Sequence, residues 1–277
     1  MTNSYSNFQI STEDNISTVL IDRPEKRNAM GKEFFENLPV VMNELSNDPN
    51  TRVVIIAANG FHFSVGLDLT SLADIGGSSL TGDGQTSRAS QAKSLLKEVY
   101  RLQEAISSVE ECPKPVIAVT HGYCIGGGLD LITAADIRIA SKDSIFSLRE
   151  TKMAMVADLG SLARLPFIIG SGSVAELAYT GKDVDAFRAK EIGLINHLKD
   201  SKEDALSKAK EIATEIAGNS PLAVEGTKAI LNLAKRQSIE EGLKNVALFN
   251  SGHLMSNDLT EAVMAFFEKR KPNFSGS

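Results

Sequence analysis

The chain has 277 residues, of which 42% are hydrophobic and 23% are charged, and its formal net charge at pH 7 is −6. This length and composition suffice for one large globular domain or for a domain with an appendage. The acidic balance, without a long run of Lys or Arg, argues against the broad basic surface typical of nucleic-acid binding. No apolar run approaches the length that crosses a membrane. We therefore expect no nucleic-acid partner and no membrane partner.

The cysteines and histidines form no metal-binding pattern. Cys112 and Cys124 lack the spacing of metal ligands, and the four histidines are scattered along the chain. So few cysteines in a chain of this length indicate a reducing compartment and no metal. Residues 1–11 lack the pattern of a signal or transit peptide, and the last residues form no peroxisomal Ser-Lys-Leu address. We expect a cytoplasmic location.

The first elements predict a parallel sheet. Residues 8–10 and 16–21 are two predicted strands joined by a turn, which indicates a hairpin. A polar loop, DRPEKRNAM, occupies residues 22–30, and a predicted helix covers residues 31–47. Residues 52–58 form a continuous apolar run that predicts a buried strand. A strand, a helix and a strand in this order favour a parallel sheet.

A single glycine and a polar segment follow this strand. Gly66 lies between two apolar residues at the end of a short extended stretch, where it can present a bare backbone amide. Residues 73–91 are rich in Gly, Ser, Thr and Asp, which predicts a mobile loop, either a lid near a site or a surface excursion. A helix is predicted for residues 92–109 and a β-branched strand for residues 115–120.

Three consecutive glycines organise the centre of the chain. In residues 121–138, HGYCIGGGLDLITAADIR, the glycines at 126–128 separate an apolar strand from a predicted amphipathic helix, whose apolar stripe runs from Leu129 to Ile137. Their amides lie in the first helical turn, where N–H groups have no intrahelical acceptor, so that a partial negative charge would bind there. Glycine turns also bind phosphates or merely allow tight packing. The spacing fits neither a P-loop nor a dinucleotide fingerprint.

The second half of the chain changes from strands to helices. The predicted elements are strands at residues 136–140, 144–148 and 193–198, and helices at residues 161–180 (interrupted at Pro166 and Gly170), 182–190, 204–217, 221–234, 239–254 and 258–269. Ser220 before Pro221 is a predicted N-cap with proline at the first helical position. We therefore divide the chain into a sheet-and-helix core, residues 1–200, and a helical C-terminal region, residues 201–277.

These motifs carry a resemblance over nearly the whole chain. The stretches concerned are IDRPEKRNAM, FSVGLDL, KPVIAVTHGYCIGGGLDL, YTGKDVDAFRAKEIGLINHL and FFEKRKPNF. Through them the chain resembles the enoyl-CoA hydratase/isomerase (crotonase) family from about Phe8 to Phe274. The resemblance implies an α/β fold, a crotonase-like spiral of ββα repeats with a C-terminal helical trimerisation region. It also implies a homotrimer or a hexamer (dimer of trimers), an acyl-CoA thioester substrate, and no cofactor beyond the coenzyme A of that substrate.

The family's chemistry gives the glycine turns a function. Removal of a proton from the carbon beside a thioester creates an enolate, and two backbone N–H donors that face its oxygen stabilise the charge as it forms. By the resemblance, these donors are the amides of Leu67 and Gly127, which form an oxyanion hole. Each such donor is typically worth roughly 3 kcal/mol of barrier.

Three acidic residues decide which branch of the family the chain resembles. Hydratases of the family carry one glutamate after the glycine turn and a second one further along, at the positions of Asp130 and Glu150 here. Asp158 stands where hydratases usually carry glycine. The trio resembles the dienoyl-CoA isomerases, which convert a 3,5-diene to the conjugated 2,4-diene. We assign Glu150 to proton removal at C2, Asp158 to proton delivery at C6, and Asp130 to orienting or tuning the pair. Because three carboxyls in an apolar pocket should not all ionise together, we expect at least one raised pKa.

Other interpretations of these acids stay open at this point. Asp130 lies in a first helical turn, where the helix dipole favours an acid, and Asp158 is placed to cap a helix that begins near Ser161. One alternative function is a 2-enoyl-CoA hydratase in which Asp130 and Glu150 activate water. Another is a non-catalytic acyl-CoA-binding or RNA-binding relative, although the acidic balance argues against RNA.

The resemblance also implies contacts with coenzyme A. Lys26 and Arg27 match the loop that wraps the adenine and pantetheine, and Lys271 matches a C-terminal basic residue near the CoA phosphates that can reach in from another subunit. The remaining substrate-binding residues that it implies are Gly66, Asp68 and Gly126. The chain departs from the family's frequent Pro-Glu at residues 149–150, which read Arg-Glu, and the length of the acyl chain stays open.

Overall fold

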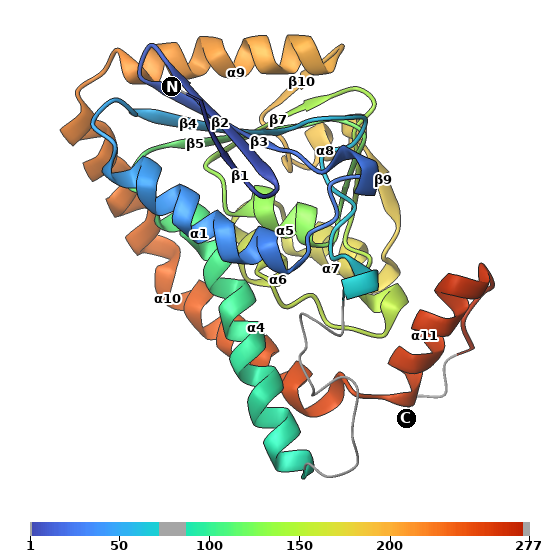
Figure 1. Cartoon of the computed structure of the whole chain (residues 1–277). Coiled ribbons are helices and arrows are strands. Elements are labelled where there is room, and N and C mark those ends of the chain that lie inside the picture. Colours follow the sequence, from blue (N-terminus) through green and yellow to red (C-terminus); the bar gives the residue numbers. More distant parts are fainter. Residues whose placement is uncertain (1, 72–86, 274–277) are drawn as a thin grey trace.

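The computed structural model describes residues 2–71 and 87–273, and Figure 1 shows the arrangement of the elements. Most of the segment predicted as a mobile loop, residues 73–91, lies outside the described residues. Its end, residues 88–91, was predicted wrongly because it already belongs to helix α4 (Arg88–Glu111). The side chain of the N-cap Ser87 accepts a hydrogen bond from the Ser90 amide, which fixes the start of this helix.

A seven-stranded sheet forms the centre of the fold (Figure 1). The strands lie in the order β1 (Thr2–Tyr5), β2 (Phe8–Glu13), β3 (Ile16–Ile21), β4 (Val53–Ala58), β5 (Val116–Thr120), β7 (Ile137–Ser141) and β10 (His197–Lys199). The first three strands pair antiparallel, and β3 to β10 pair parallel. The predicted hairpin and the predicted parallel sheet are confirmed. The hairpin turns at Asp14 and Asn15, both at positive φ, and β1 was not predicted.

Helices cover both faces of this sheet, which explains the continuous apolar run of β4. The side chains of β4 alternate between two buried clusters. Helix α9 (Lys202–Ala217) lies across one face, and α1 (Lys32–Asn47) and α4 lie on the other (Figure 1). The buried face of α9 consists of an alanine at every fourth position: Ala205, Ala209, Ala213 and Ala217. Thus α9 packs on the sheet of the core, although we assigned it to the C-terminal region that begins at residue 201. The division of the chain into these two regions stays a prediction.

A second, three-stranded sheet is formed by short strands that lie between strands of the large sheet along the chain. It consists of β6 (Tyr123–Ile125), β8 (Ile145–Ser147) and β9 (Asp183–Asp185). Each of β5 and β7 is followed at once by a strand of this second sheet, so that successive turns wind through both sheets, as expected for a spiral of ββα repeats. The helix predicted at 182–190 is wrong in its first part, because α8 (Ala186–Glu191) starts only after Asp185, whose side chain accepts from the Arg188 amide.

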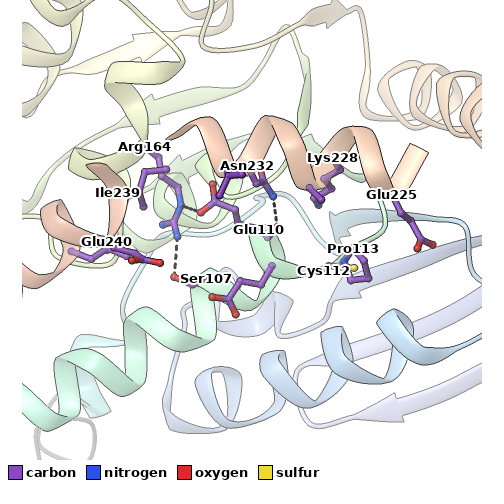
Figure 2. A pocket seen from close by; sticks show the side chains of 14 residues that line it. Ser107, Glu110, Cys112, Pro113, Arg164, Glu225, Lys228, Asn232, Ile239 and Glu240 are labelled. Carbon is purple, nitrogen blue, oxygen red and sulfur yellow. Dashed lines mark hydrogen bonds and ion pairs between the residues drawn. The ribbon is translucent and has the colours of Figure 1, made fainter. Parts of the chain in front are cut away.

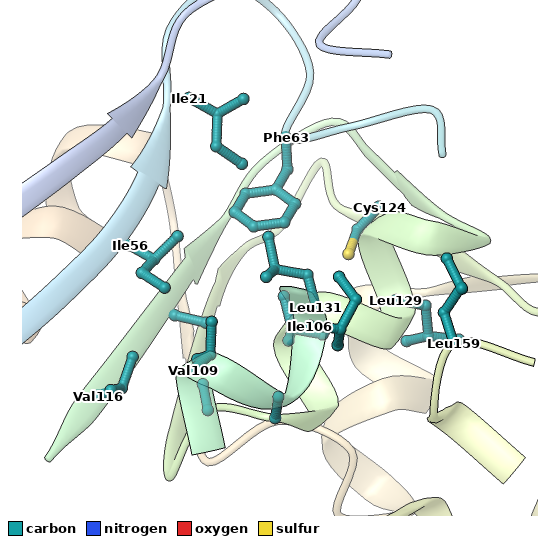
Figure 3. Packing of buried hydrophobic residues seen from close by; sticks show 14 of the residues in the cluster. Ile21, Ile56, Phe63, Ile106, Val109, Val116, Cys124, Leu129, Leu131 and Leu159 are labelled. Atoms are coloured by element: carbon teal, nitrogen blue, oxygen red, sulfur yellow. The ribbon is translucent and has the colours of Figure 1, made fainter. Parts of the chain in front are cut away.

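The central helix after the glycines is shorter than predicted. Helix α5 spans Gly127–Thr133, and Ile137, the end of the predicted apolar stripe, belongs to β7. The chain leaves the helix because Asp136 bonds Val116 through both its backbone and its carboxylate, which ties the start of β7 to β5. Every residue of α5 is buried, so the helix is not amphipathic. Figure 3 shows its leucines packed with side chains of α4 and the strands.

The remaining helical segments are four helices and four short turns among the described residues. They are α6 (Ser161–Arg164), α7 (Ser171–Thr180), α10 (Pro221–His253), α11 (Asn257–Glu268) and the short 3-10 turns η1 (Pro24–Lys26), η2 (Leu69–Ser71), η3 (Glu150–Met153) and η4 (Leu165–Phe167). The two helices predicted at 221–234 and 239–254 are one continuous helix, α10, which runs beside α4 (Figure 1). Pro221 opens α10 as predicted, but the Ser220 side chain makes no capping hydrogen bond.

A cavity of about 490 Å³ lies between α4 and α10, around the buried ion pair of Arg164 and Glu110 (Figure 2). None of the predicted catalytic residues lines it.

Within residues 2–71 and 87–273, no helix is long and apolar enough to cross a membrane. The same part of the chain holds no group of three or more acidic, cysteine or histidine side chains that could bind a metal ion. The absence of a metal and of a further cofactor stays a prediction.

Candidate active site

The two glycine turns singled out by the sequence meet backbone to backbone. Gly66 has φ of +86° and Gly126 has φ of +52°, a region that favours glycine. A Cβ atom on Gly66 would lie 2.8 Å from the Ile125 carbonyl oxygen and 3.2 Å from the Gly127 nitrogen. Any other residue at position 66 would push the turns apart. The glycines therefore make room for protein atoms, in addition to any space that they leave for a ligand.

The amides of Leu67 and Gly127 are both available at this junction. The Met30 amide donates to the Gly66 carbonyl (2.8 Å) and the Asp68 amide donates to the Met30 carbonyl (3.0 Å). Because N–H groups alternate in direction along an extended chain, the Leu67 N–H points away from Met30. Gly127 is the first residue of α5, so its N–H has no intrahelical acceptor. Among the described residues neither amide has a hydrogen-bond acceptor.

A polar clamp that the sequence analysis missed holds the Leu67 turn. Arg23 donates to the Asp68 carboxylate (2.7 Å) and to the Ala29 carbonyl (3.1 Å). The Ser64 hydroxyl donates to the Asn28 carbonyl (2.8 Å) and accepts from the Gly66 amide (3.1 Å). The loop after β3 is thereby fastened to the turn that carries Leu67. The Asp68 carboxylate, predicted to bind substrate, contacts Arg23 and Thr70.

Glu150 lies directly over the central glycine turn. It is the first residue of η3, just after β8, and the adjacent Arg149 forms a bidentate ion pair with Asp183 on the neighbouring strand β9 (both 2.6 Å). A Cβ atom on Gly126 would stand 3.1 Å from Glu150 Oε1. The other carboxylate oxygen, Oε2, is buried without a hydrogen-bond partner. Its carboxyl is thus next to the residue that precedes Gly127, with one oxygen left for a substrate.

Asp158 is held by two helices that are distant in the sequence. Asn250 on α10 donates from Nδ2 to Asp158 Oδ2 (2.7 Å) and to the Val156 carbonyl (2.9 Å). Gln103 on α4 donates to the backbone carbonyl of Asp158 (2.7 Å) and to that of Leu243 on α10 (3.0 Å). The irregular segment that carries Asp158 is therefore fixed from both sides. Neither amide was predicted, because nothing in a single sequence marks a polar residue of a long helix as the partner of a distant acid.

Asp130 is the most deeply buried of the three acids. Its side chain is 1% exposed, and Oδ1 accepts a hydrogen bond from the Ser161 amide (2.6 Å) at the start of α6. The alternative that Asp158 caps this helix is wrong, since Gly160 is the N-cap and Asp130 accepts the amide instead. The Arg164 guanidinium favours the ionised form of Asp130, yet burial outweighs it and raises the pKa of Asp130 to about 6.

The three carboxyls act on one another. Burial raises the pKa of Glu150 to about 8, and the charge of Asp130 and, less strongly, of Asp158 adds to the effect. Burial also raises the pKa of Asp158 to about 6, with a further contribution from the Asp130 charge and an opposing one from the Asn250 hydrogen bond. This is the behaviour of carboxyls that share an apolar site. Near neutral pH the cluster carries fewer than three negative charges, and titratable acids of this kind are typical of catalytic sites.

The cationic residues predicted to bind coenzyme A lie at the surface. Lys26 and Arg27 are exposed, and Arg27 lines a cavity of about 230 Å³ together with Phe61 and His62. Lys271 is exposed beyond the end of α11, where its carbonyl accepts a hydrogen bond from Arg270. Their assignment to the substrate stays a prediction.

A sequence profile of the enoyl-CoA hydratase/isomerase family matches residues 11–277. The chain belongs to the enoyl-CoA hydratase/isomerase family. It is similar to the peroxisomal Δ(3,5)-Δ(2,4)-dienoyl-CoA isomerase of Arabidopsis thaliana, with 42% identity over 275 residues that cover 98% of each chain. It is equally similar to the mitochondrial protein of the same activity from Dictyostelium discoideum, at 42% identity over 94% of this chain and 87% of the relative.

Solved structures of the family share the fold. The crystal structure of an enoyl-CoA hydratase/isomerase from Pseudoalteromonas atlantica superposes with a TM-score of 0.82 at 26% identity, covering 97% of this chain and 100% of the other. The crotonase-like spiral expected for this α/β chain is therefore confirmed.

Proposed function

We propose that this protein is a Δ(3,5)-Δ(2,4)-dienoyl-CoA isomerase. The observation that carries the proposal is the presence of two half-buried acids, Glu150 and Asp158, in one electrostatically coupled cluster, with Glu150 beside the paired glycine turns. Moving a 3,5-diene to the 2,4-position requires proton removal at C2 and proton addition at C6, and one carboxyl reaches only one of these carbons. Two relatives at 42% identity over nearly the whole chain are named Δ(3,5)-Δ(2,4)-dienoyl-CoA isomerases, which supports the same reaction.

The first step is removal of a C2 proton by the ionised Glu150. The electron pair of the C2–H bond spreads over the diene and onto the thioester oxygen, which gives an extended trienolate. The amides of Leu67 and Gly127 would donate to that oxygen, and each such donor typically lowers the barrier by roughly 3 kcal/mol. The position of Glu150 over Gly126 supports this step, because it puts the base next to the turn that carries one of the donors.

The second step is proton delivery to C6 by Asp158. The new C6–H bond forms as the O–H bond of Asp158 breaks, and the double bonds settle between C2 and C3 and between C4 and C5. Glu150 has then gained one proton and Asp158 has lost one, so a proton returns to Asp158 before the next turnover. Because the pKa of Glu150 (about 8) exceeds that of Asp158 (about 6), the unliganded pair holds its single proton mainly on Glu150. The forward reaction starts from the tautomer in which Asp158 carries the proton and Glu150 is ionised.

Asp130 tunes this pair without touching the substrate in our proposal. One of its oxygens is fixed by the Ser161 amide, and its charge raises the pKa values of both Glu150 and Asp158. The hydratase alternative would instead require Asp130 to hold a water molecule with Glu150. The burial of Asp130 and its hydrogen bond to Ser161 argue against that role, and water addition leaves Asp158 without a function. A cluster of buried acids also argues against an RNA-binding relative, because RNA phosphates carry the same charge.

The surface supports an acyl-CoA substrate and an oligomer. The cavity lined by Arg27, Phe61 and His62 offers a cation and two rings to part of coenzyme A, and Glu25 lines it as well. Lys26 and Lys271 are further exposed cations that do not line this cavity. Several apolar side chains of α10 and α11 are more than half exposed: Ile230, Leu231, Leu233, Phe266 and Phe267. A large exposed apolar surface typically marks an interface. We propose that the C-terminal helices pair with other copies in a homotrimer or a dimer of trimers.

The location of the protein stays a prediction. The names of the similar dienoyl-CoA isomerases place those proteins in peroxisomes or mitochondria. Their names lend no support to the predicted cytoplasmic location, and fractionation of cells that express the protein would test it.

Two substrates test the proposed reaction. The purified protein is incubated with a 3,5-dienoyl-CoA and, separately, with a 2-enoyl-CoA of the same chain length. We expect rapid formation of the conjugated 2,4-dienoyl-CoA from the first and little loss of the second. Vigorous hydration of the 2-enoyl-CoA without any diene conversion would favour the hydratase. Binding of both esters without turnover would favour the non-catalytic relative.

A further inference from the structure

Asn250 is the polar residue of α10 that reaches into the acidic cluster. Its side chain is 2% exposed, and Nδ2 contacts both the Val156 carbonyl (2.9 Å) and Asp158 Oδ2 (2.7 Å). A backbone carbonyl only accepts hydrogen bonds, so the amide group must turn its NH₂ toward Val156. The orientation of Asn250 is therefore fixed by a group that cannot titrate, and Asp158 Oδ2 always meets a donor.

This donor makes the two oxygens of Asp158 unequal. Oδ2 accepts the N–H of Asn250, and an oxygen that already accepts a donor in a buried site is the poorer place for a proton. When Asp158 is protonated, its proton therefore resides on Oδ1. Within the described chain, the charged groups that face Asp158 are the carboxyls of Asp130 from α5 and Glu150 from η3, while α4 contributes the neutral Gln103 amide.

We propose that Asn250 is a positioning residue that reserves Oδ2 of Asp158 for hydrogen-bond acceptance and so makes Oδ1 the atom that carries the transferred proton. The proposal rests on the isomerase reaction for its kinetic consequences, but its structural content concerns only Asn250 and Asp158. Asn250 also favours the ionised form of Asp158, which lowers the pKa of this carboxyl in a site where burial and the Asp130 charge raise it.

The test compares Asn250→Leu with Asn232→Leu on the same helix. Asn232 also donates across to α4, to the Glu110 carbonyl (3.0 Å), and lines the cavity outside the acidic cluster (Figure 2). Both variants lose one side-chain amide that bridges α10 to a backbone carbonyl. We expect Asn250→Leu to lower kcat roughly tenfold to a hundredfold, the cost of a lost hydrogen bond to a charged group, with KM changed little. Asn232→Leu should leave kcat within about twofold of wild type.

A second readout does not depend on turnover. In protein labelled with carbon-13 aspartate, the carboxyl resonance absent from Asp158→Asn reports the titration of Asp158. We expect this titration to move to higher pH in Asn250→Leu and to stay unchanged in Asn232→Leu. An unchanged titration in folded Asn250→Leu, or an equal loss of kcat in both variants, would overturn the proposal. Asn250→Ala removes the same donor without adding a charge and repeats the test if Asn250→Leu does not fold, with the same expected direction.

The two proposals can fail separately. If the wild-type protein does not convert a dienoyl-CoA while Asp158 still titrates at higher pH in Asn250→Leu, the isomerase proposal fails and the positioning role stands. If the wild-type protein is active and the titration of Asp158 does not respond to Asn250, only the positioning role fails.

Discussion

The carboxyl of Glu150 and the backbone of Gly126 are in such close contact that a Cβ atom on Gly126 would lie 3.1 Å from Glu150 Oε1. The contact joins the two halves of the proposed chemistry, because the base and the glycine turn that stabilises the enolate belong to one packed unit. Gly126 also has φ of +52°, so the backbone conformation at this position favours glycine. Replacing either residue should therefore disturb the other.

The first prediction separates the roles of the two acids. Asp158→Asn should abolish conversion of a 3,5-dienoyl-CoA but retain exchange of the C2 protons with solvent deuterium, because Glu150 still removes them. Glu150→Gln should lose both conversion and exchange. Mass spectrometry of the recovered substrate measures the exchange. Loss of C2 exchange in Asp158→Asn with its retention in Glu150→Gln would reverse our assignment.

The second prediction concerns the oxyanion donors. Gly66→Ala should lower kcat about a hundredfold or more, as removal of one such donor does, since the new methyl group would meet the Ile125 carbonyl at 2.8 Å and displace Leu67 from Gly127. Gly226→Ala is the matched control, because a Cβ atom there meets no atom within 4 Å. Steady-state kinetics on both variants provides the measurement. Wild-type kcat in folded Gly66→Ala would refute the oxyanion role of this turn.

The third prediction is the pH dependence of the reaction. Catalysis requires one proton on the pair formed by Glu150 and Asp158, so kcat/KM should rise with pH through about 6, as the doubly protonated pair loses one proton, and fall above about 8, as the last proton leaves. The two limbs belong to the pair as a whole. A profile that keeps rising well above pH 8 would show that no proton on these acids is needed.

The fourth prediction concerns stability. The pKa of Glu150 is about 8 in the folded chain against 4.5 ordinarily, so the folded state binds the extra proton and stability is lost as pH rises between these values. Glu150→Gln removes this loss and should raise Tm at about pH 9, where each kcal/mol corresponds to about 2–4 °C, but not at about pH 5. The exposed Glu215→Gln on α9 serves as the control. Equal Tm values for wild type and Glu150→Gln at both pH values would mean that Glu150 is not held in a costly ionised state.

Local patterns predicted much of the fold. The apolar run of β4, the hairpin turn at Asp14 and the glycines at 66 and 126 follow from backbone and burial rules that act within a few residues. Family spacing located Glu150 and Asp158. Short strands such as β6 were not predicted, because three residues are too few for a period to show.

Long-range partners were beyond the reach of these patterns. The break predicted inside α10 does not exist, because tertiary packing along α4 outweighs a weak local helical pattern. Asn250 could not be assigned to Asp158, since a hydrogen bond between residues so far apart in the sequence leaves no mark in a single sequence. The ion pair between Arg23 and Asp68 was not predicted either, because these residues are also far apart in the sequence.

A single turnover in deuterium oxide tests the central claim most directly. Enzyme in excess, equilibrated in deuterium oxide, is mixed with a 3,5-dienoyl-CoA, and the product is analysed by NMR after one turnover. Two acids acting at separate carbons predict a 2,4-dienoyl-CoA that carries deuterium at C6, delivered from the exchanged carboxyl of Asp158. Protium at C6, which would mean that one group carries the same hydrogen from C2, or a 3-hydroxyacyl-CoA product would contradict the account.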